Sequence, residues 1–304
     1  MPTVALVLGA GGVTGGAFHA GVLAALAETT GWDPRSAALV VGTSAGAATG
    51  AALRAGLPAP DLAARALGDQ LSEEGRDVLR RAGAPVAPPP VPRRPRARLG
   101  PPAGLGALAG ALRRPWRVRP GAVLAGLLPA GSVPTDDISG GIGALHPAGW
   151  PAASLWVCAV RLDDGALVVF GRDPSRATVG EAVAASCAIP GWFAPVEIDG
   201  ARYVDGGAHS FTNVAEVAPQ RPDLVVVSSP LSRYGPGRAQ LALEVQRVRR
   251  RNIPVVTFEP TGEVASAMGA NAMDPSRRPA VVRAARTMAR RRVEDLGDRL
   301  SALG

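Results

Sequence analysis

The sequence contains no lysine, two cysteines and only 4% aromatic residues, so all 33 of its basic residues are arginine. Cys158 and Cys187 are too few for a disulfide scaffold or a cysteine-based zinc site. The scarcity of aromatic side chains leaves little material for the stacking platforms that bind single-stranded nucleic acid. We therefore do not take the net charge of +8 as a sign of nucleic-acid binding, and we expect no metal and no cofactor.

The hydropathy and charge pattern of the sequence also predicts neither a membrane span nor a signal peptide. The N-terminus has no basic region before its short apolar run, which favours a buried strand over a signal peptide. Residues 36–53 carry no charge, but their three glycines and four small polar residues argue against a span. We therefore predict a cytoplasmic protein and leave open peripheral contact with the inner face of the membrane.

What the chain does contain is 304 residues with 47% hydrophobic content, which is typical of a folded α/β protein. Apolar runs that end in glycine alternate with helical patterns, and this alternation predicts parallel strands joined by crossover helices in one domain spanning 1–304. The expected strands are 3–8, 37–41, 154–161, 166–170, 224–228 and 253–258. The expected helices are 16–28, 45–55, 60–71, 178–187, 237–250 and an arginine-rich one at 278–302.

The segment 78–135 differs from the rest of the chain. It holds ten arginines, no acidic residue and a high density of proline, and we interpret it as a partly irregular insertion on the α/β body. Three roles stay open: an insertion of no special role, a lid over the active site, or a basic surface that meets lipid phosphate. The remainder of the chain has a net charge of −2, because this segment alone contributes +10 of the total.

The most specific short motif is Gly-Thr-Ser-Ala-Gly at 42–46, a G-x-S-x-G between a predicted strand and a predicted helix. This context is typical of a nucleophile elbow, in which a tight turn exposes the serine hydroxyl at a helix N-terminus. Gly42 and Gly46 are needed where the turn leaves no room for a Cβ. Ser44 is therefore the candidate nucleophile, and the alternative is a glycine-rich turn that contains serine by chance.

A second glycine-rich loop, Gly-Ala-Gly-Gly-Val-Thr-Gly-Gly at 9–16, follows the first predicted strand. It does not match the dinucleotide fingerprint G-x-G-x-x-G in either register. Successive backbone N–H groups at a helix N-terminus nevertheless bind anions, including the oxyanion of acyl transfer. A nucleotide- or phosphate-binding regulatory domain that uses this loop remains the alternative function.

A serine nucleophile needs a base, and the chain has three histidines, His19, His146 and His209. In a Ser-His-Asp triad, His209 is the candidate base. In the other arrangement the Asp205 carboxylate contacts Ser44 directly. The residues alone leave both arrangements open.

Taken in order, these motifs resemble the patatin-like phospholipases. The shared features are the glycine loop, the Gly-Thr-Ser-Ala-Gly turn, Ala-Ser-Cys-Ala-Ile-Pro-Gly-Trp-Phe-Ala-Pro-Val at 185–196, Tyr-Val-Asp-Gly-Gly at 203–207 and Asn213. The resemblance covers residues 4–55 and 154–229. It implies a three-layer α/β/α sandwich with a mainly parallel sheet, and hydrolysis of acyl esters in phospholipids, lysophospholipids or neutral lipids.

The resemblance also assigns roles. It implies a dyad of Ser44 as nucleophile and Asp205 as base, and an oxyanion hole made by the backbone N–H groups around Gly11, Gly12 and Val13. The motif glycines expected to support these groups are Gly9, Gly15, Gly42, Gly46, Gly206 and Gly207. Acyl transfer to another alcohol would use the same intermediate, and a decayed enzyme that only contacts membranes is a further alternative.

Two positions depart from the family pattern. Thr14 stands where members commonly carry arginine or lysine, and Ala10 stands where they carry glycine. The loss of the cation weakens a specific preference for phospholipids over simpler lipid esters. Alanine is a mild change wherever the backbone φ is negative.

Overall fold

The computed structural model describes residues 2–88, 90–92, 100–113, 118–297 and 300. Within these residues eight strands form one sheet: β1 (Val4–Leu8), β2 (Leu39–Thr43), β3 (Ser154–Arg161), β4 (Leu167–Phe170), β5 (Val196–Ile198), β6 (Ala201–Asp205), β7 (Leu224–Ser228) and β8 (Val255–Phe258). The helices are α1 (Gly12–Thr30), α2 (Ala45–Arg54), α3 (Ala59–Leu67), α4 (Glu73–Arg81), α5 (Gly106–Arg113), α6 (Pro120–Leu127), α7 (Asp136–Leu145), α8 (Val179–Cys187), α9 (Gly235–Arg249), α10 (Gly262–Met268) and α11 (Arg278–Leu296).

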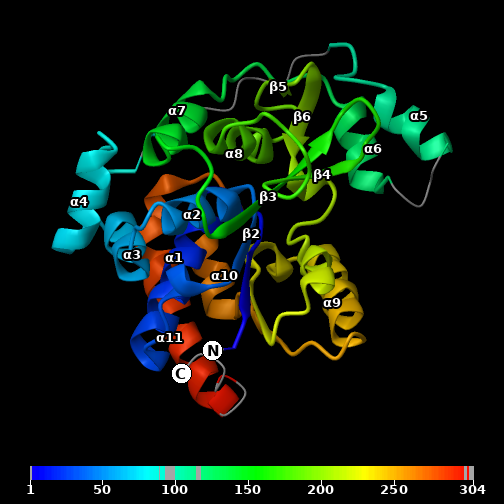
Figure 1. Ribbon diagram of the computed structural model, residues 1–304. Helices are drawn as coiled ribbons and strands as arrows, with labels where there is room; N and C mark the ends of the chain where they lie inside the picture. The colour runs from blue at the N-terminus through cyan, green and yellow to red at the C-terminus, as the bar shows by residue number, and fades with distance from the viewer. Residues whose placement is uncertain (1, 89, 93–99, 114–117, 298–299, 301–304) are drawn as a thin grey trace.

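The strands lie in the order β5-β6-β3-β2-β1-β7-β8, and β4 also pairs with β3 (Figure 1). β3, β2, β1, β7 and β8 run parallel, whereas β4 and β6 run antiparallel to β3. Leu8 pairs with Gly42 at the carboxyl ends of β1 and β2. The loops that follow these two strands therefore emerge side by side, at the edge where open α/β sheets place their sites.

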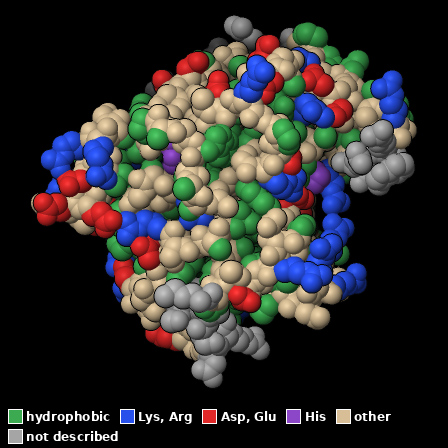
Figure 2. Space-filling model, viewed as in Figure 1, with side chains coloured by type: hydrophobic (Ala, Val, Ile, Leu, Met, Phe, Trp, Pro, Cys, Tyr) green, Lys and Arg blue, Asp and Glu red, His purple; other side chains and the backbone are tan. Residues whose placement is uncertain are grey.

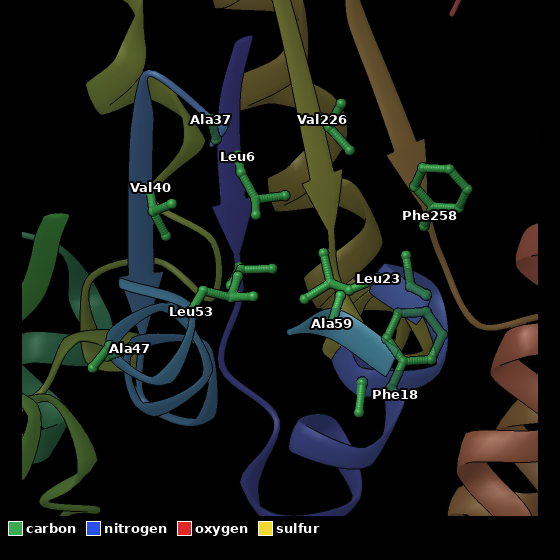
Figure 3. Close-up of a cluster of buried hydrophobic side chains, with 14 of the residues drawn as sticks. Leu6, Phe18, Leu23, Ala37, Val40, Ala47, Leu53, Ala59, Val226 and Phe258 are labelled. Carbon is green, nitrogen blue, oxygen red and sulfur yellow. The ribbon is translucent and has the colours of Figure 1, made fainter. Parts of the chain in front are cut away.

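Helices cover both faces of the sheet. Val4, Leu6 and Leu8 point to the face packed by α1, α2 and α11, while Ala5 and Val7 point to the opposite face, packed by α9. Figure 3 shows the first of these clusters, in which side chains of β1, β2, β7 and β8 converge with those of α1 and α2. The predicted α/β architecture with a mainly parallel sheet is confirmed. Its central strands are fully buried β-branched runs, as expected for parallel strands covered by helices on both faces.

The predicted strands and helices are all present, and the main corrections concern their ends. The first helix begins at Gly12 rather than at residue 16, since the glycine loop already turns into helix. The helix predicted over 60–71 ends at Leu67, where Gly68 takes a left-handed conformation. The helix predicted over 278–302 ends at Leu296, before Gly297. Of the remainder of that prediction, residues 298–299 and 301–302 lie outside the described residues.

Several elements were not predicted. The short strands β5 and β6 form an antiparallel pair whose alternation is too brief to stand out in the sequence. The segment 78–135 is more regular than expected, because it contains α5 and α6. Both helices pack on one side of the sheet through a small apolar cluster that includes Val160 and Val204. In the part of the chain that the structure describes, no helix combines the length and apolarity needed to cross a membrane.

Candidate active site

The Ser44 side chain lies at the sharp turn between β2 and α2. The strand ends at the residue before it and the helix begins at the residue after it. Its backbone takes φ 54° and ψ −120°, a strained combination for a residue with a Cβ. The turn places the hydroxyl at the N-terminus of α2, whose partial positive charge favours a developing serine oxyanion. The elbow predicted from G-x-S-x-G is therefore present as a backbone geometry.

The glycines on either side of Ser44 are required by the backbone around them. A Cβ at Gly46 would overlap the carbonyl group of Leu8 in β1, and a Cβ at Gly42 would overlap the backbone of Ala47. Both clashes involve backbone atoms, so no side-chain rotation can relieve them.

The other motif glycines differ in how much space the surrounding atoms leave for a Cβ. A Cβ at Gly206 would overlap the carbonyl group of Cys158, and one at Gly9 would lie 3.0 Å from the carbonyl oxygen of Phe211. A Cβ at Gly207 would lie 3.0 Å from the Asp205 carboxylate, whereas the space at Gly15 accepts a methyl group at ordinary contact distance. The need for glycine is therefore strongest where the backbone of another segment passes close by.

Asp205, the last residue of β6, meets Ser44 across the sheet edge. Its carboxylate accepts a hydrogen bond from the Gly207 N–H at 2.7 Å, and the Ser44 side chain lies close enough to interact with it. Burial raises the pKa of Asp205 to about 6, while the interactions with Ser44 and Gly207 act in the opposite direction. A carboxylate with a pKa near 6 is a stronger base than an exposed aspartate. The two residues that the motifs singled out thus lie close together, although they are far apart in the sequence.

Two residues that the sequence did not single out also contact this pair. The Ser44 N–H donates to Ser186 Oγ at 2.9 Å, and that hydroxyl donates to the Cys158 carbonyl at 2.6 Å. The Cys187 thiol lies close enough to interact with the Ser44 side chain, and burial, then the charge of Asp205, raises its pKa well above the usual range. Ser186 therefore holds the elbow, while the thiol of Cys187 stays protonated. Both lie in the 185–196 motif, whose role the sequence could not assign.

Three successive backbone N–H groups of the glycine loop have no acceptor in the described part of the chain. On one side of them, the Gly9 and Ala10 N–H groups bond to the carbonyls of Ser228 and Phe211, and on the other the Thr14 and Gly15 N–H groups bond to those of Ala272 and Gly11. Among the described residues, the N–H groups of Gly11, Gly12 and Val13 have no hydrogen-bond acceptor. Three unpaired donors at the N-terminus of α1 are a ready-made anion site.

His19 supports this loop from behind. Its Nε2–H donates to the Gly9 carbonyl at 2.8 Å, so its Nδ1 must accept from the Ser228 hydroxyl, also at 2.8 Å. Burial lowers the pKa of His19 to about 4, with the Gly9 bond acting in the opposite direction. The imidazole is therefore neutral and fully occupied by the loop, which leaves it no role as a base for Ser44.

The other two histidines are also separate from the Ser44–Asp205 pair. His146 Nε2 bonds to the Ala51 carbonyl at 2.9 Å. Within the described residues, His209 Nδ1 is buried without a hydrogen-bond partner, and burial, then the charge of Arg119, lowers its pKa to about 4. No imidazole bonds to Ser44 or Asp205 in the described chain. Of the two arrangements left open by the sequence, the geometry favours direct contact.

Asn213 forms hydrogen bonds with both chain segments that carry the candidate catalytic residues. It adopts a left-handed conformation with φ 52°, and its Nδ2 donates to Thr43 Oγ1 at 3.0 Å and to the Ser210 carbonyl at 2.9 Å. Thr43 immediately precedes the elbow, and Ser210 lies five residues after Asp205. One buried amide therefore couples the segments that carry the candidate nucleophile and the candidate base.

The two departures from the family pattern have different consequences. Ala10 is not among the residues with positive φ, so the change from glycine causes no backbone strain. Thr14 is fully buried, and its hydroxyl has no hydrogen-bond partner in the described chain. The site therefore has no cation at this position. Nor do the described residues contain a group of three side chains able to hold a metal ion.

The sequence model of a family described as patatin-like phospholipase matches residues 6–218, which is more than half of the chain. No curated protein matches the chain significantly. Among solved structures, one that matches is the crystal structure of VipD from Legionella pneumophila, with 14% sequence identity and a TM-score of 0.44. That alignment covers 97% of this chain and 67% of VipD, and at this level of similarity it bears on neither substrate nor partner.

Proposed function

The chain belongs to the patatin-like phospholipase family, and on that premise we propose that it is a serine hydrolase that cleaves carboxylic esters of lipids through Ser44 and Asp205. The observation that carries the proposal is the proximity of the Ser44 side chain to a buried carboxylate whose pKa is raised to about 6. The strained turn at Ser44 and the unpaired N–H groups of residues 11–13 support the same chemistry.

The proposed reaction has two steps. Ser44 Oγ attacks the ester carbonyl carbon while Asp205 accepts its proton, and the resulting oxyanion is bound by the N–H groups of Gly11, Gly12 and Val13. The intermediate collapses, the alcohol leaves with the proton from Asp205, and an acyl-serine remains. Water then attacks the acyl group, Asp205 again takes and returns the proton, and the fatty acid is released. An alcohol in place of water would make the same enzyme an acyltransferase.

The substrate class is a lipid acyl ester, without a stated head group. A basic residue at position 14 would offer a counter-charge to a phosphate, and Thr14 offers none. The proposed enzyme needs no cofactor.

We also propose a cytoplasmic location and contact with anionic membrane through the arginine-rich segment 78–135, which has no acidic residue.

A fluorophosphonate probe tests the nucleophile. We expect the purified protein to be labelled covalently, and the Ser44→Ala variant to lose labelling completely because the probe reacts with an activated serine hydroxyl. Ser186→Ala is the matched control, since it removes a buried hydroxyl near the site but not the proposed nucleophile. Persistent labelling of Ser44→Ala would exclude the assignment. Saturable nucleotide binding without any labelling would support the anion-binding alternative for the glycine loop.

The raised pKa of Asp205 predicts how activity depends on pH. A base must be ionised to accept a proton, so kcat/KM for a soluble short-chain ester should be constant above about pH 7 and fall below pH 6. The limiting decrease for one titrating group is about tenfold per pH unit. Circular dichroism at each pH separates this loss from unfolding. A decrease centred near pH 4, the ordinary range for aspartate, would contradict a buried carboxylate base.

A further inference from the structure

The outer surfaces of α5 and α6 expose an unusual set of leucines. Among the described residues, nine large hydrophobic side chains are exposed, and six of them lie between residues 105 and 128. We call these six the leucine face: Leu105, Leu108, Leu112, Leu124, Leu127 and Leu128. Leu112 is the most exposed at 79%, followed by Leu124 at 60% and Leu105 at 57%. Such a concentration on one pair of helices marks an interaction surface rather than scattered surface apolar residues.

The packing of the two helices is the reverse of that expected for a helix on a soluble protein. Their small residues face inward: Ala107, Ala122 and Ala125 are buried, and Ala122 and Ala125 pack in the cluster with Val160 and Leu162. Backbone contacts prevent a rotation that would bury the leucines instead. A Cβ at Gly106 or Gly110 of α5 would overlap the β3–β4 turn, and one at Gly121 of α6 would overlap the Ala208 carbonyl. The fold therefore holds the leucine face toward solvent.

Described basic residues border both helices of the leucine face. Arg113 ends α5 and Arg119 directly precedes α6, and residues 100–135 contain no acidic residue. Two carboxylates, Asp163 and Asp164, belong to the turn beneath α5, and they pair with Arg202 at 3.8 Å and with Arg161 at 2.6 Å. In Figure 2 basic side chains are visible at the end of the molecule that carries α5. Exposed leucine flanked by arginine complements an anionic lipid surface.

The leucine face is also next to the active site. Figure 1 shows α5 and α6 at the end of the molecule that carries β4 and β6, away from α11 and both termini. Gly121 of α6 lies against Ala208, three residues after Asp205. A Cβ added at Gly191 would lie 3.8 Å from the Leu128 side chain, and Gly191 is in the same loop whose Ala188 carbonyl accepts the Asp205 N–H at 2.9 Å. A membrane that covers the leucine face would thus lie beside the segments that hold Asp205.

We propose that the leucine face is the membrane-docking surface of this protein. Its leucines insert among the acyl chains at the headgroup boundary of an anionic bilayer, and the flanking arginines bind lipid phosphate. Docking would bring the enzyme to lipid esters in the membrane. This benefit for catalysis rests on the proposed function. The docking itself does not need an intact active site, so the two proposals can fail separately.

The test is co-sedimentation with vesicles made of equal parts of phosphatidylglycerol and phosphatidylcholine, at about 0.15 M salt, where exposed charges are partly screened. The protein carries Ser44→Ala so that no lipid is consumed. The test variant adds Leu105→Ser, Leu112→Ser and Leu124→Ser, and the control adds Leu243→Ser instead, because Leu243 on α9 is 59% exposed on another layer. We expect the triple variant to bind at least about tenfold more weakly, and the control to bind within twofold of the parent.

Three results would overturn the proposal: no vesicle binding by the parent, equal weakening by the triple variant and the control, or unchanged binding by the triple variant. If the parent is a dimer by light scattering and the triple variant is a monomer with unchanged vesicle binding, the leucine face is a contact between copies of the chain.

The proposed function is measured separately. With Ser44 intact, the triple variant should hydrolyse a soluble short-chain ester as fast as the wild type, and absence of that activity from both would contradict the hydrolase but not the docking.

Discussion

Asp205→Asn is expected to lower kcat/KM for a soluble ester by about a thousandfold or more, within the range that removal of a general base produces. The amide has the size of the carboxylate, and its oxygen can still accept the hydrogen bond from the Gly207 N–H. What it loses is the ability to accept a proton from Ser44. The substitution therefore tests proton transfer rather than the position of the side chain. Steady-state hydrolysis of a short-chain ester measures the effect without a membrane interface.

His209→Ala is the matched control for this prediction. His209 lies four residues from Asp205 and is buried with a lowered pKa, so it has the burial and location of a triad member but no bond to Ser44 or Asp205. We expect this variant to keep most of its activity. If instead His209→Ala loses more activity than Asp205→Asn, a triad through His209 operates. Circular dichroism and thermal unfolding of both variants ensure that neither loss arises from misfolding.

Gly46→Ala is expected to destabilise the protein by about 3–5 kcal/mol, in the upper range for overpacking of a well-packed core. The added methyl group would overlap the carbonyl group of Leu8, and that carbonyl belongs to a central strand of the sheet. Relief requires α2 to move away from β1, and such a movement would also shift the strained Ser44 turn at the start of α2. Urea unfolding measures the free energy of unfolding. Fluorophosphonate labelling of the folded fraction measures the loss of serine reactivity.

Gly16→Ala is the control for the overlap at Gly46. Gly16 lies inside helix α1, has no atom within 4 Å of the place where a Cβ would lie, and is outside the set of glycines with positive φ. Alanine there should be neutral or stabilise the protein by about 0.5–1 kcal/mol, because it reduces the conformational freedom of the unfolded chain. If the two substitutions destabilise the protein equally, the overlap with Leu8 is not the cause. The glycine-rich segments would then be sensitive to any alanine substitution.

The parallel core of the fold was predictable because its signals are local. The runs at β1, β2 and β7 are continuous and β-branched, as expected for strands buried on both faces. The turn at Ser44 was also predictable, since two glycines around a serine between a strand and a helix leave few other conformations. The order of these motifs, together with the aspartate at 205, was enough to suggest the family. Each strand, turn and motif depends on residues within a few positions of one another, and only the order of the motifs spans the chain.

The antiparallel elements were not predictable in the same way. β5 and β6 are short, and β6 becomes a strand because it pairs with β3, more than 40 residues earlier in the chain. Helices α5 and α6 lie in a proline- and arginine-rich segment, and their identity depends on contact between alanines and the sheet. Local propensity is weak in both cases, so long-range packing decides the structure.

The sequence by itself therefore determined the strand and helix alternation, the glycine turns and the candidate residues Ser44 and Asp205. Only the tertiary structure decided that these two side chains lie close together, that the described histidines are occupied elsewhere or have no bond to them, and that the leucines of α5 and α6 face solvent. The physical reason is the range of the interactions. A turn or an apolar run acts within one element, whereas the pKa of a carboxylate, the partner of an imidazole and the exposure of a leucine depend on which distant segments pack around them.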